Sequence, residues 1–132
     1  MGRLLASVFA ALLFSGPATT ALAQTGAPTL TEVQKIEALI AHLEGLKDIT
    51  FVRNGRAYSP RTTARFVRGK WNANKAAIKT ARDFIEKAAS VSSTTGKPYL
   101  IRFKDGTERP SGAYLLAELE KLEKPATASL TR

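Results

Sequence analysis

The pair Asn54-Gly55, between two runs typical of β-strands, constrains the fold more than any other feature of this sequence. The first run, Ile49-Thr50-Phe51-Val52-Arg53, is β-branched and aromatic, and the second, Arg56-Ala57-Tyr58, is shorter. Both residues of an Asn-Gly pair tolerate positive φ, which a two-residue hairpin turn requires. We therefore predict a β-hairpin or, because the second arm is short, a turn that leads directly into a helix.

A second pair of strands is expected further along the chain. Tyr99, Ile101 and Phe103 alternate with other residues, so they share one face of an extended segment. Asp105-Gly106 then predicts a turn, and Thr107-Glu108-Arg109 can return as a short partner strand.

Four other segments carry apolar residues at helical spacing. The first spans about residues 30–46, and we expect Thr29 and Glu32 to form a capping box at its start. The second begins at Ser59, an N-cap residue followed by proline, the third at Thr80 and the fourth at Ser111. The expected buried stripes of the first and fourth helices are Val33, Ile36, Leu39, Ile40, Leu43 and Leu46, and Leu115, Leu116, Leu119 and Leu122.

The order helix, hairpin, two helices, hairpin, helix predicts a small, mostly helical single α+β domain, with about four helices and two short β-hairpins. This domain is expected to span residues 30–124, after a short lead-in at residues 24–29. Residues 125–132 begin with proline and have no apolar pattern, so we expect a disordered tail. Whether the second and third helices are continuous stays open.

Residues 1–23 have the pattern of a secretory signal peptide. Arg3 precedes an apolar run that is too short to span a bilayer, and Ala21-Leu22-Ala23 offers signal peptidase its small residues. We predict cleavage after Ala23 and a periplasmic location, with an uncleaved anchor as the alternative. The 109 residues that remain of 132 contain no second long apolar run, so no membrane span is expected in the mature chain.

The chain has no cysteine and one histidine, His42. The lack of cysteine excludes a disulfide scaffold, thiolate zinc sites, iron–sulfur clusters and cysteine nucleophiles. One histidine excludes a site with several histidine ligands, and we expect no metal and no cofactor. At the edge of the first apolar stripe, His42 is expected to be half-exposed packing, although it is the one side chain that titrates near neutrality.

The positive charge of the chain is concentrated in one segment. The net charge is +9, and residues 53–82 contain nine basic residues and no acidic one. Such a segment is either a solvated surface or a binding surface for anions. In the periplasm the anions are lipid phosphates, peptidoglycan carboxylates or an acidic protein. Nucleic acid would bind without specificity, and the expected export argues against it as a partner.

The polar loop Ser90–Lys97 ends in Gly96-Lys97, but it is not a phosphate-binding P-loop. The leading glycine is absent, proline follows the lysine, and a strand rather than a helix comes next. The loop can be an anion-binding nest or a connection held by its own hydroxyl groups.

Several strings occur together in a specific order. They are Phe51-Val52-Arg53-Asn54-Gly55 with Tyr58, Thr80 to Ile85, Ala89 to Ser93 with Gly96-Lys97-Pro98-Tyr99, and Pro110-Ser111 before a leucine-rich helix. In these strings the sequence resembles the YfeK-like family of small proteobacterial periplasmic proteins, a domain of unknown function, over about residues 32–122. The resemblance implies export and a single α+β domain, and it implies no activity, cofactor or catalytic residue.

The resemblance directs attention to polar residues beside chain reversals, where functional side chains are often presented. We hypothesise that Arg53, Tyr58, Ser92, Ser93 and Lys97 meet in one surface site for an anionic group. Arg61, Arg65 and Arg68 on the second helix are expected to extend this site as a basic face.

The leading hypothesis for function is a non-enzymatic, periplasmic interaction module that contacts an anionic envelope component or an acidic protein through its basic face. A small hydrolase or transferase that uses His42 or the Ser90–Lys97 loop is the first alternative. The second alternative is a protein inhibitor that presents Asn54-Gly55 or residues 92–96 to an enzyme cleft.

Overall fold

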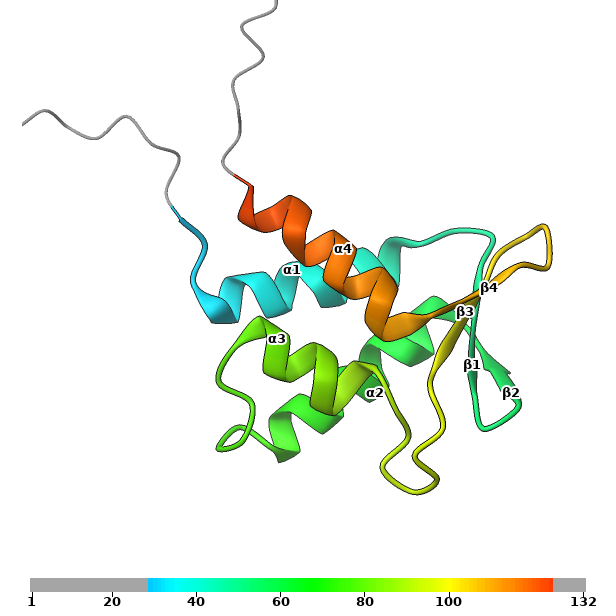
Figure 1. Cartoon of the computed structure of the whole chain (residues 1–132), viewed down its shortest axis with the longest axis horizontal. Coiled ribbons are helices and arrows are strands. Elements are labelled where there is room, and N and C mark those ends of the chain that lie inside the picture. Colours follow the sequence, from blue (N-terminus) through cyan, green and yellow to red (C-terminus); the bar gives the residue numbers. More distant parts are fainter. Residues whose placement is uncertain (1–28, 125–132) are drawn as a thin grey trace, which may run out of the picture.

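Both predicted hairpins form, and they join into a single antiparallel sheet in the computed structural model, which describes residues 29–124 (Figure 1). The strands lie in the order β2-β1-β3-β4. Their bounds are β1 (Thr50–Arg53), β2 (Arg56–Tyr58), β3 (Leu100–Arg102) and β4 (Glu108–Pro110). Phe51 of β1 pairs with Tyr58 of β2 on one side and with Ile101 of β3 on the other. The second arm of the first hairpin is therefore a true strand.

The helical elements are α1 (Glu32–Gly45), α2 (Pro60–Ala73), α3 (Ala81–Phe84) and α4 (Ser111–Glu123). A π-helical turn, η1 (Ile85–Ala89), continues α3 without a break. Turns at residues 74–80 separate α2 from α3, so the second and third helices are not continuous. The observed architecture is the predicted small α+β fold.

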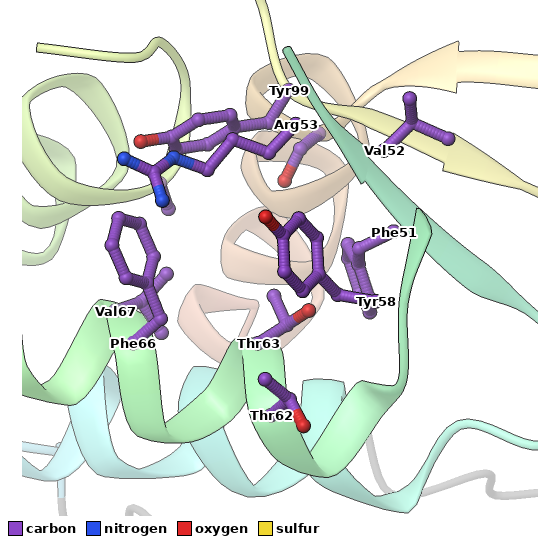
Figure 2. Close-up of a pocket in the computed structure, with 11 residues that line it drawn as sticks. Phe51, Val52, Arg53, Tyr58, Thr62, Thr63, Phe66, Val67 and Tyr99 are labelled. Carbon is purple, nitrogen blue, oxygen red and sulfur yellow. The ribbon is translucent and has the colours of Figure 1, made fainter. Parts of the chain in front are cut away.

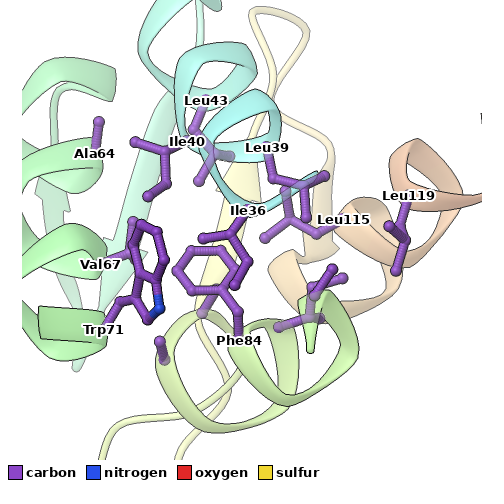
Figure 3. Packing of buried hydrophobic residues seen from close by; sticks show 14 of the residues in the cluster. Ile36, Leu39, Ile40, Leu43, Ala64, Val67, Trp71, Phe84, Leu115 and Leu119 are labelled. Carbon is purple, nitrogen blue, oxygen red and sulfur yellow. The ribbon is translucent and has the colours of Figure 1, made fainter. Parts of the chain in front are cut away.

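The core lies where α1 packs against α2, α3 and α4 (Figure 3). Phe84 is fully buried at its centre, and its ring packs edge-on against Trp71 with the ring centroids 6.3 Å apart. Ile101 of β3 is also fully buried, which joins the sheet to the same core. This arrangement leaves the face of β1 near Arg53 and the facing side of α2 to form a separate pocket.

The starts of α2 and α3 are as predicted. Ser59 caps α2 by accepting the backbone N–H of Thr62, with Pro60 at the first helical position. Thr80 and Asp83 form a capping box at α3. These caps depend on residues within one helical turn, so the local sequence is sufficient to fix them.

The predicted capping box of α1 is wrong. The N-cap is Thr31, which pairs with Gln34, and not Thr29 with Glu32. The Glu32 carboxylate instead accepts the backbone N–H of Ala81 at 2.7 Å, and so ties α1 to the start of α3.

Three other expectations about single residues are also wrong. Val33 and Leu116 are 57% and 38% exposed, so they lie outside the buried stripes to which they were assigned. Ser111 is buried as the first residue of α4, and Pro110 occupies the N-cap position without a side-chain hydrogen bond.

The start of α1 and the end of α4 lie on the same side of the molecule, away from the hairpin of β1 and β2 (Figure 1). Lys35 of α1 forms ion pairs with Glu32 at 2.9 Å and with Glu123 near the end of α4 at 3.4 Å. Arg82 also binds Glu123, at 3.3 Å, so α1, α3 and α4 share one ionic cluster.

In the part of the chain that the structure describes, no helix has both the length and the apolar content that crossing a bilayer requires. The predicted signal peptide, its cleavage after Ala23 and the predicted tail at residues 125–132 lie outside the described residues. The same is true of the lead-in except Thr29.

Candidate functional site

A pocket of about 70 Å³ lies between the β1–β2 hairpin and α2 (Figure 2). Apolar and aromatic side chains from β1, α2 and η1 form most of its wall, and hydroxyl groups and one guanidinium group lie among them. The lining residues are Phe51, Val52, Arg53, Tyr58, Thr62, Thr63, Phe66, Val67, Ala89, Tyr99 and Ser111.

The local sequence explains how these elements surround the pocket. Asn54 and Gly55 adopt φ of 49° and 78°, which folds β2 back on β1 and brings Tyr58 opposite Phe51. Pro60 then starts α2 almost immediately, so that Thr62 and Phe66, four residues apart, share the helix face toward the hairpin.

The π-helical turn η1 forms the far wall of the pocket through Ala89. The Ser90 hydroxyl donates to the carbonyl of Ile85 at 2.6 Å and so closes this turn. π-helical turns are rare and are frequent at functional sites. The small side chain of Ala89 leaves space where a larger residue would fill it.

Two cations lie against the aromatic residues of the pocket. Cζ of Arg53 is 4.2 Å from the centre of the Phe66 ring, and Figure 2 shows its guanidinium group extended above that ring. Nζ of Lys70 is 5.7 Å from the Phe66 ring centre and 5.3 Å from that of Tyr99. Cation–π contacts of this kind hold a positive charge without neutralising it.

Neither cation has an acidic partner among residues 29–124. Lys70 donates to the Tyr99 hydroxyl at 3.2 Å and to the carbonyl of Val91 at 3.3 Å. The Nε of Arg53 is buried and has no hydrogen-bond partner within the described chain. The pocket therefore combines an apolar interior with unneutralised positive charge, which suits an anionic group on an apolar body.

Of the predicted site residues, Arg53 and Tyr58 lie together at this pocket. Ser92 is 1% exposed and accepts a hydrogen bond from Nδ2 of Asn54 at 3.2 Å. Thr95 of the same loop donates to Oδ1 of Asn54 at 2.6 Å. The hydroxyl loop and the Asn-Gly turn thus lie side by side, but the Ser92 hydroxyl serves this contact and does not line the pocket. Ser93 and Lys97 are exposed on the same loop and do not line the pocket.

The three arginines of α2 lie on a different side of the helix from the pocket. Arg61, Arg65 and Arg68 recur at intervals of four and three residues, so they share one helix face. Arg68 binds both carboxylate oxygens of Glu37 on α1, at 2.9 Å and 2.7 Å. The hydrogen bonds from Arg68 hold the pKa of Glu37 below its ordinary value. Arg61 and Arg65 are exposed.

The predicted site residues did not include Thr62, Phe66 and Lys70, which lie at or beside the pocket. Their spacing of four places them on one face of a helix, and this face carries a hydroxyl, an aromatic ring and a cation. That signal was present in the sequence, but nothing local indicates that this face turns toward Arg53.

His42 lies apart from the pocket, on the side of α1 that faces α4. Its Nε2 is 2.6 Å from the Tyr114 hydroxyl and 3.8 Å from the Glu118 carboxylate. Burial, and then the negative charge of Glu118, raise the pKa of Tyr114. No partner was predicted for His42, because the spacing of Tyr114 and Glu118 shows only that these two side chains share a face of α4.

Comparison with known proteins places the chain in a family. A protein of Salmonella typhimurium strain LT2, described as uncharacterized protein YfeK, is 44% identical over 68 residues. This match spans 52% of the present chain and 57% of the Salmonella protein. No solved structure matches the chain. The model of a family of unknown function, DUF5329, matches residues 30–123, which include all of the helices and strands described above. The chain is therefore a member of this family, DUF5329, and the resemblance to YfeK-like proteins is confirmed.

Proposed function

We propose that this chain is a periplasmic binding module whose pocket holds an anionic group of an envelope component or of an acidic protein. The apolar run before Ala21-Leu22-Ala23 supports export through a cleaved signal peptide. The excess of basic residues between positions 53 and 82 supports an anionic partner, because unneutralised charge attracts counter-ions to the surface.

One observation carries this proposal: Arg53 and Lys70 converge on Phe66 without an acidic neighbour in the described chain. Two cations that approach one ring repel each other, and that repulsion is relieved when an anion binds near both. The buried Nε–H of Arg53 adds a donor without an acceptor, and such a donor costs free energy until a ligand supplies one.

The basic α2 face of Arg61 and Arg65 is the other surface that could bind anions, and it provides the matched control. The two variants are Arg53→Gln with Lys70→Gln at the pocket, and Arg61→Gln with Arg65→Gln on the exposed face. Each removes two positive charges from the chain, so a difference between them reports position rather than net charge.

The test is to express the full-length chain, with its N-terminal segment, in bacteria and purify it from the periplasmic fraction at low and high salt. We expect the wild type and the Arg61/Arg65 variant to retain an anionic component at low salt and to release it at high salt. The Arg53/Lys70 variant should retain none. Equal retention by all three chains, loss only in the Arg61/Arg65 variant, or absence of the chain from the periplasm contradicts the proposal.

A hydrolase that uses His42 is less well supported. Tyr114 and Glu118 lie close to His42, as a base with an orienting partner requires. The described pocket, however, is lined by no residue of α1, so the His42 cluster lies outside it. The pocket itself is lined by no carboxylate or imidazole from residues 29–124.

A further inference from the structure

We infer that the pocket binds a carboxylate carried on a short apolar group, with Arg53 as the residue that grips the carboxylate. This inference rests on the proposed function and names the chemistry of its ligand. It follows from three properties of the pocket: its wall, its volume and the geometry of Arg53, whose Nε–H has no acceptor in the described chain.

The wall requires an apolar ligand body. Phe51, Val52 and Val67 present hydrocarbon surface, and Ala89 closes the far side. A sugar or another strongly polar group would lose its hydration against this hydrocarbon and regain few hydrogen bonds from the hydroxyl groups among the lining residues. The ligand portion that enters is therefore hydrocarbon, and its burial provides most of the attraction.

The volume limits the size of this hydrocarbon portion. The pocket measures about 70 Å³, roughly half of the ~150 Å³ of an apolar cavity that accepts one benzene ring. A branched chain the size of a leucine side chain fits this space, whereas a long acyl chain does not. Lipid A and phospholipid tails are therefore excluded as the group that enters.

The geometry of Arg53 selects the anion. The guanidinium group lies over the Phe66 ring, with its Cζ 4.2 Å from the ring centre, and its buried Nε–H has no acceptor in the described chain. The buried Nε–H belongs to the edge that pairs with the two oxygens of a planar carboxylate. Lys70 already donates to Tyr99 and Val91, so it offers less to a ligand. A planar carboxylate uses both of its oxygens at this edge, whereas a phosphate monoester bound there would keep a further charged oxygen without a donor from Arg53.

This chemistry has two natural sources: a free branched acid, and the C-terminal residue of a peptide with an apolar side chain. The two share the carboxylate and the hydrocarbon, and they differ only in the amide group beside the carboxylate. Isovalerate represents the first source and N-acetyl-valine the second.

The test is an NMR titration of the full-length, ¹⁵N-labelled chain. Isovalerate should shift the Arg53 Nε–H signal and the backbone amides of the pocket in a saturable way. Isovaleramide has the same shape without the charge, and it should bind at least tenfold more weakly. Because this comparison uses the wild-type chain, it does not depend on how a variant folds.

Two variants then separate the effect of the paired N–H donors of Arg53, its fork, from the effect of its positive charge. Arg53→Lys keeps a cation on Phe66 but removes the fork, and it should weaken isovalerate binding about tenfold or more. Arg61→Lys makes the same change on the exposed face of α2 and should leave binding unchanged. Tighter binding of N-acetyl-valine than of isovalerate supports a peptide end, and the reverse supports a free acid.

The inference is overturned if isovaleramide binds as well as isovalerate, or if Arg53→Lys has no effect. Tighter binding of isobutylphosphonate, with the same dependence on Arg53, would overturn the carboxylate class and leave the proposed function standing. If none of these probes binds while the periplasmic chain still retains an anion through Arg53 and Lys70, the ligand class alone is wrong. If that retention is also absent, both proposals fail.

Discussion

Asn54 performs two tasks, and only one of them is visible in the local sequence. Its φ of 49° is part of the hairpin turn, a conformation that asparagine and glycine adopt more easily than other residues. Its side chain also reaches 38 residues along the chain to Ser92 and 41 residues to Thr95. The turn residue therefore holds the hydroxyl loop in place.

The second task predicts the effect of Asn54→Gly. Glycine suits the turn at least as well, so the turn alone predicts no loss of stability. Loss of two hydrogen bonds, however, should lower the free energy of unfolding by about 1–2 kcal/mol. Urea unfolding measures this change. Ser92→Ala removes one of the two bonds without touching the turn and should cost less. An Asn54→Gly variant as stable as the wild type would show that the loop is held by other contacts.

The sequence predicts only some of the pocket residues, because only some of them have a signal in their neighbouring residues. Arg53 and Tyr58 were singled out because they flank a chain reversal, which local sequence reveals. Phe66 and Lys70 become site residues because α2 packs across the face of β1. That packing depends on how α2 meets the core through Trp71, and its core partners lie far from α2 in the sequence.

Apolar spacing predicts a helix through Ile85 and Ala88, but nothing in the sequence indicates that this part of it is the π-helical turn η1. The Ser90 hydroxyl that closes it also lies against Gly112 in the first turn of α4. A Cβ at position 112 would overlap the Ser90 hydroxyl, so glycine at this point allows η1 and α4 to approach each other. By contrast, Gly69 in α2 has open space around the position of a Cβ.

These two helical glycines make a matched pair for one prediction. Gly69→Ala should raise the free energy of unfolding by about 0.5–1 kcal/mol, because alanine favours a helix. Gly112→Ala should lower it by about 1–3 kcal/mol, since the new methyl group must displace Ser90. Thermal unfolding of both variants beside the wild type provides the measurement. If both substitutions stabilise the chain, the Ser90 hydroxyl does not exclude a Cβ at position 112.

The starts of α2 and α3 and the turn of the first hairpin were predictable because each is decided within a few residues. Ser59-Pro60, Thr80 with Asp83, and Asn54-Gly55 are examples. The pairing of β1 with β3 joins residues about fifty positions apart, and no local signal specifies it. At the start of α1, two threonines could form a capping box with a residue three positions later: Thr29 with Glu32, and Thr31 with Gln34. The choice of Thr31 leaves Glu32 free for Ala81, a contact that belongs to the tertiary structure.

At the scale of the whole molecule, carboxylates connect the helices. The hydrogen bond from the backbone of Ala81, and then the ion pair with Lys35, hold the pKa of Glu32 below its ordinary value of 4.5. The backbone N–H groups of Lys79 and Thr80 lower the pKa of Asp83 in the same way. Glu32 thus joins α1 to α3 and Glu37 joins α1 to α2, whereas Asp83 caps α3.

A lowered pKa in the folded state gives the sign of the pH dependence. The stabilisation from these carboxylates is fully present above their ordinary pKa values, 3.8 for Asp83 and 4.5 for the two glutamates. It is lost as the pH falls from there through the lower folded-state values. We expect the urea midpoint to be steady between about pH 6 and pH 8 and to fall below about pH 4.5.

Glu32→Gln is the control, because glutamine cannot be charged but can still accept from Ala81. It should lower the midpoint at neutral pH and make the acid-induced fall less steep. A midpoint that rises on acidification, or an unchanged slope in this variant, would contradict the assignment of acid sensitivity to these contacts.

The ion pair between Lys35 and Glu123 has a practical consequence for engineering. It brings together the first turn of α1 and the last turn of α4, while the pocket contains no residue of α1 and only the first residue of α4. A short linker between these two helix ends would give a circular permutant with its new termini elsewhere. By the same geometry, the domain could be inserted into a surface loop of a host protein and still present its pocket outward.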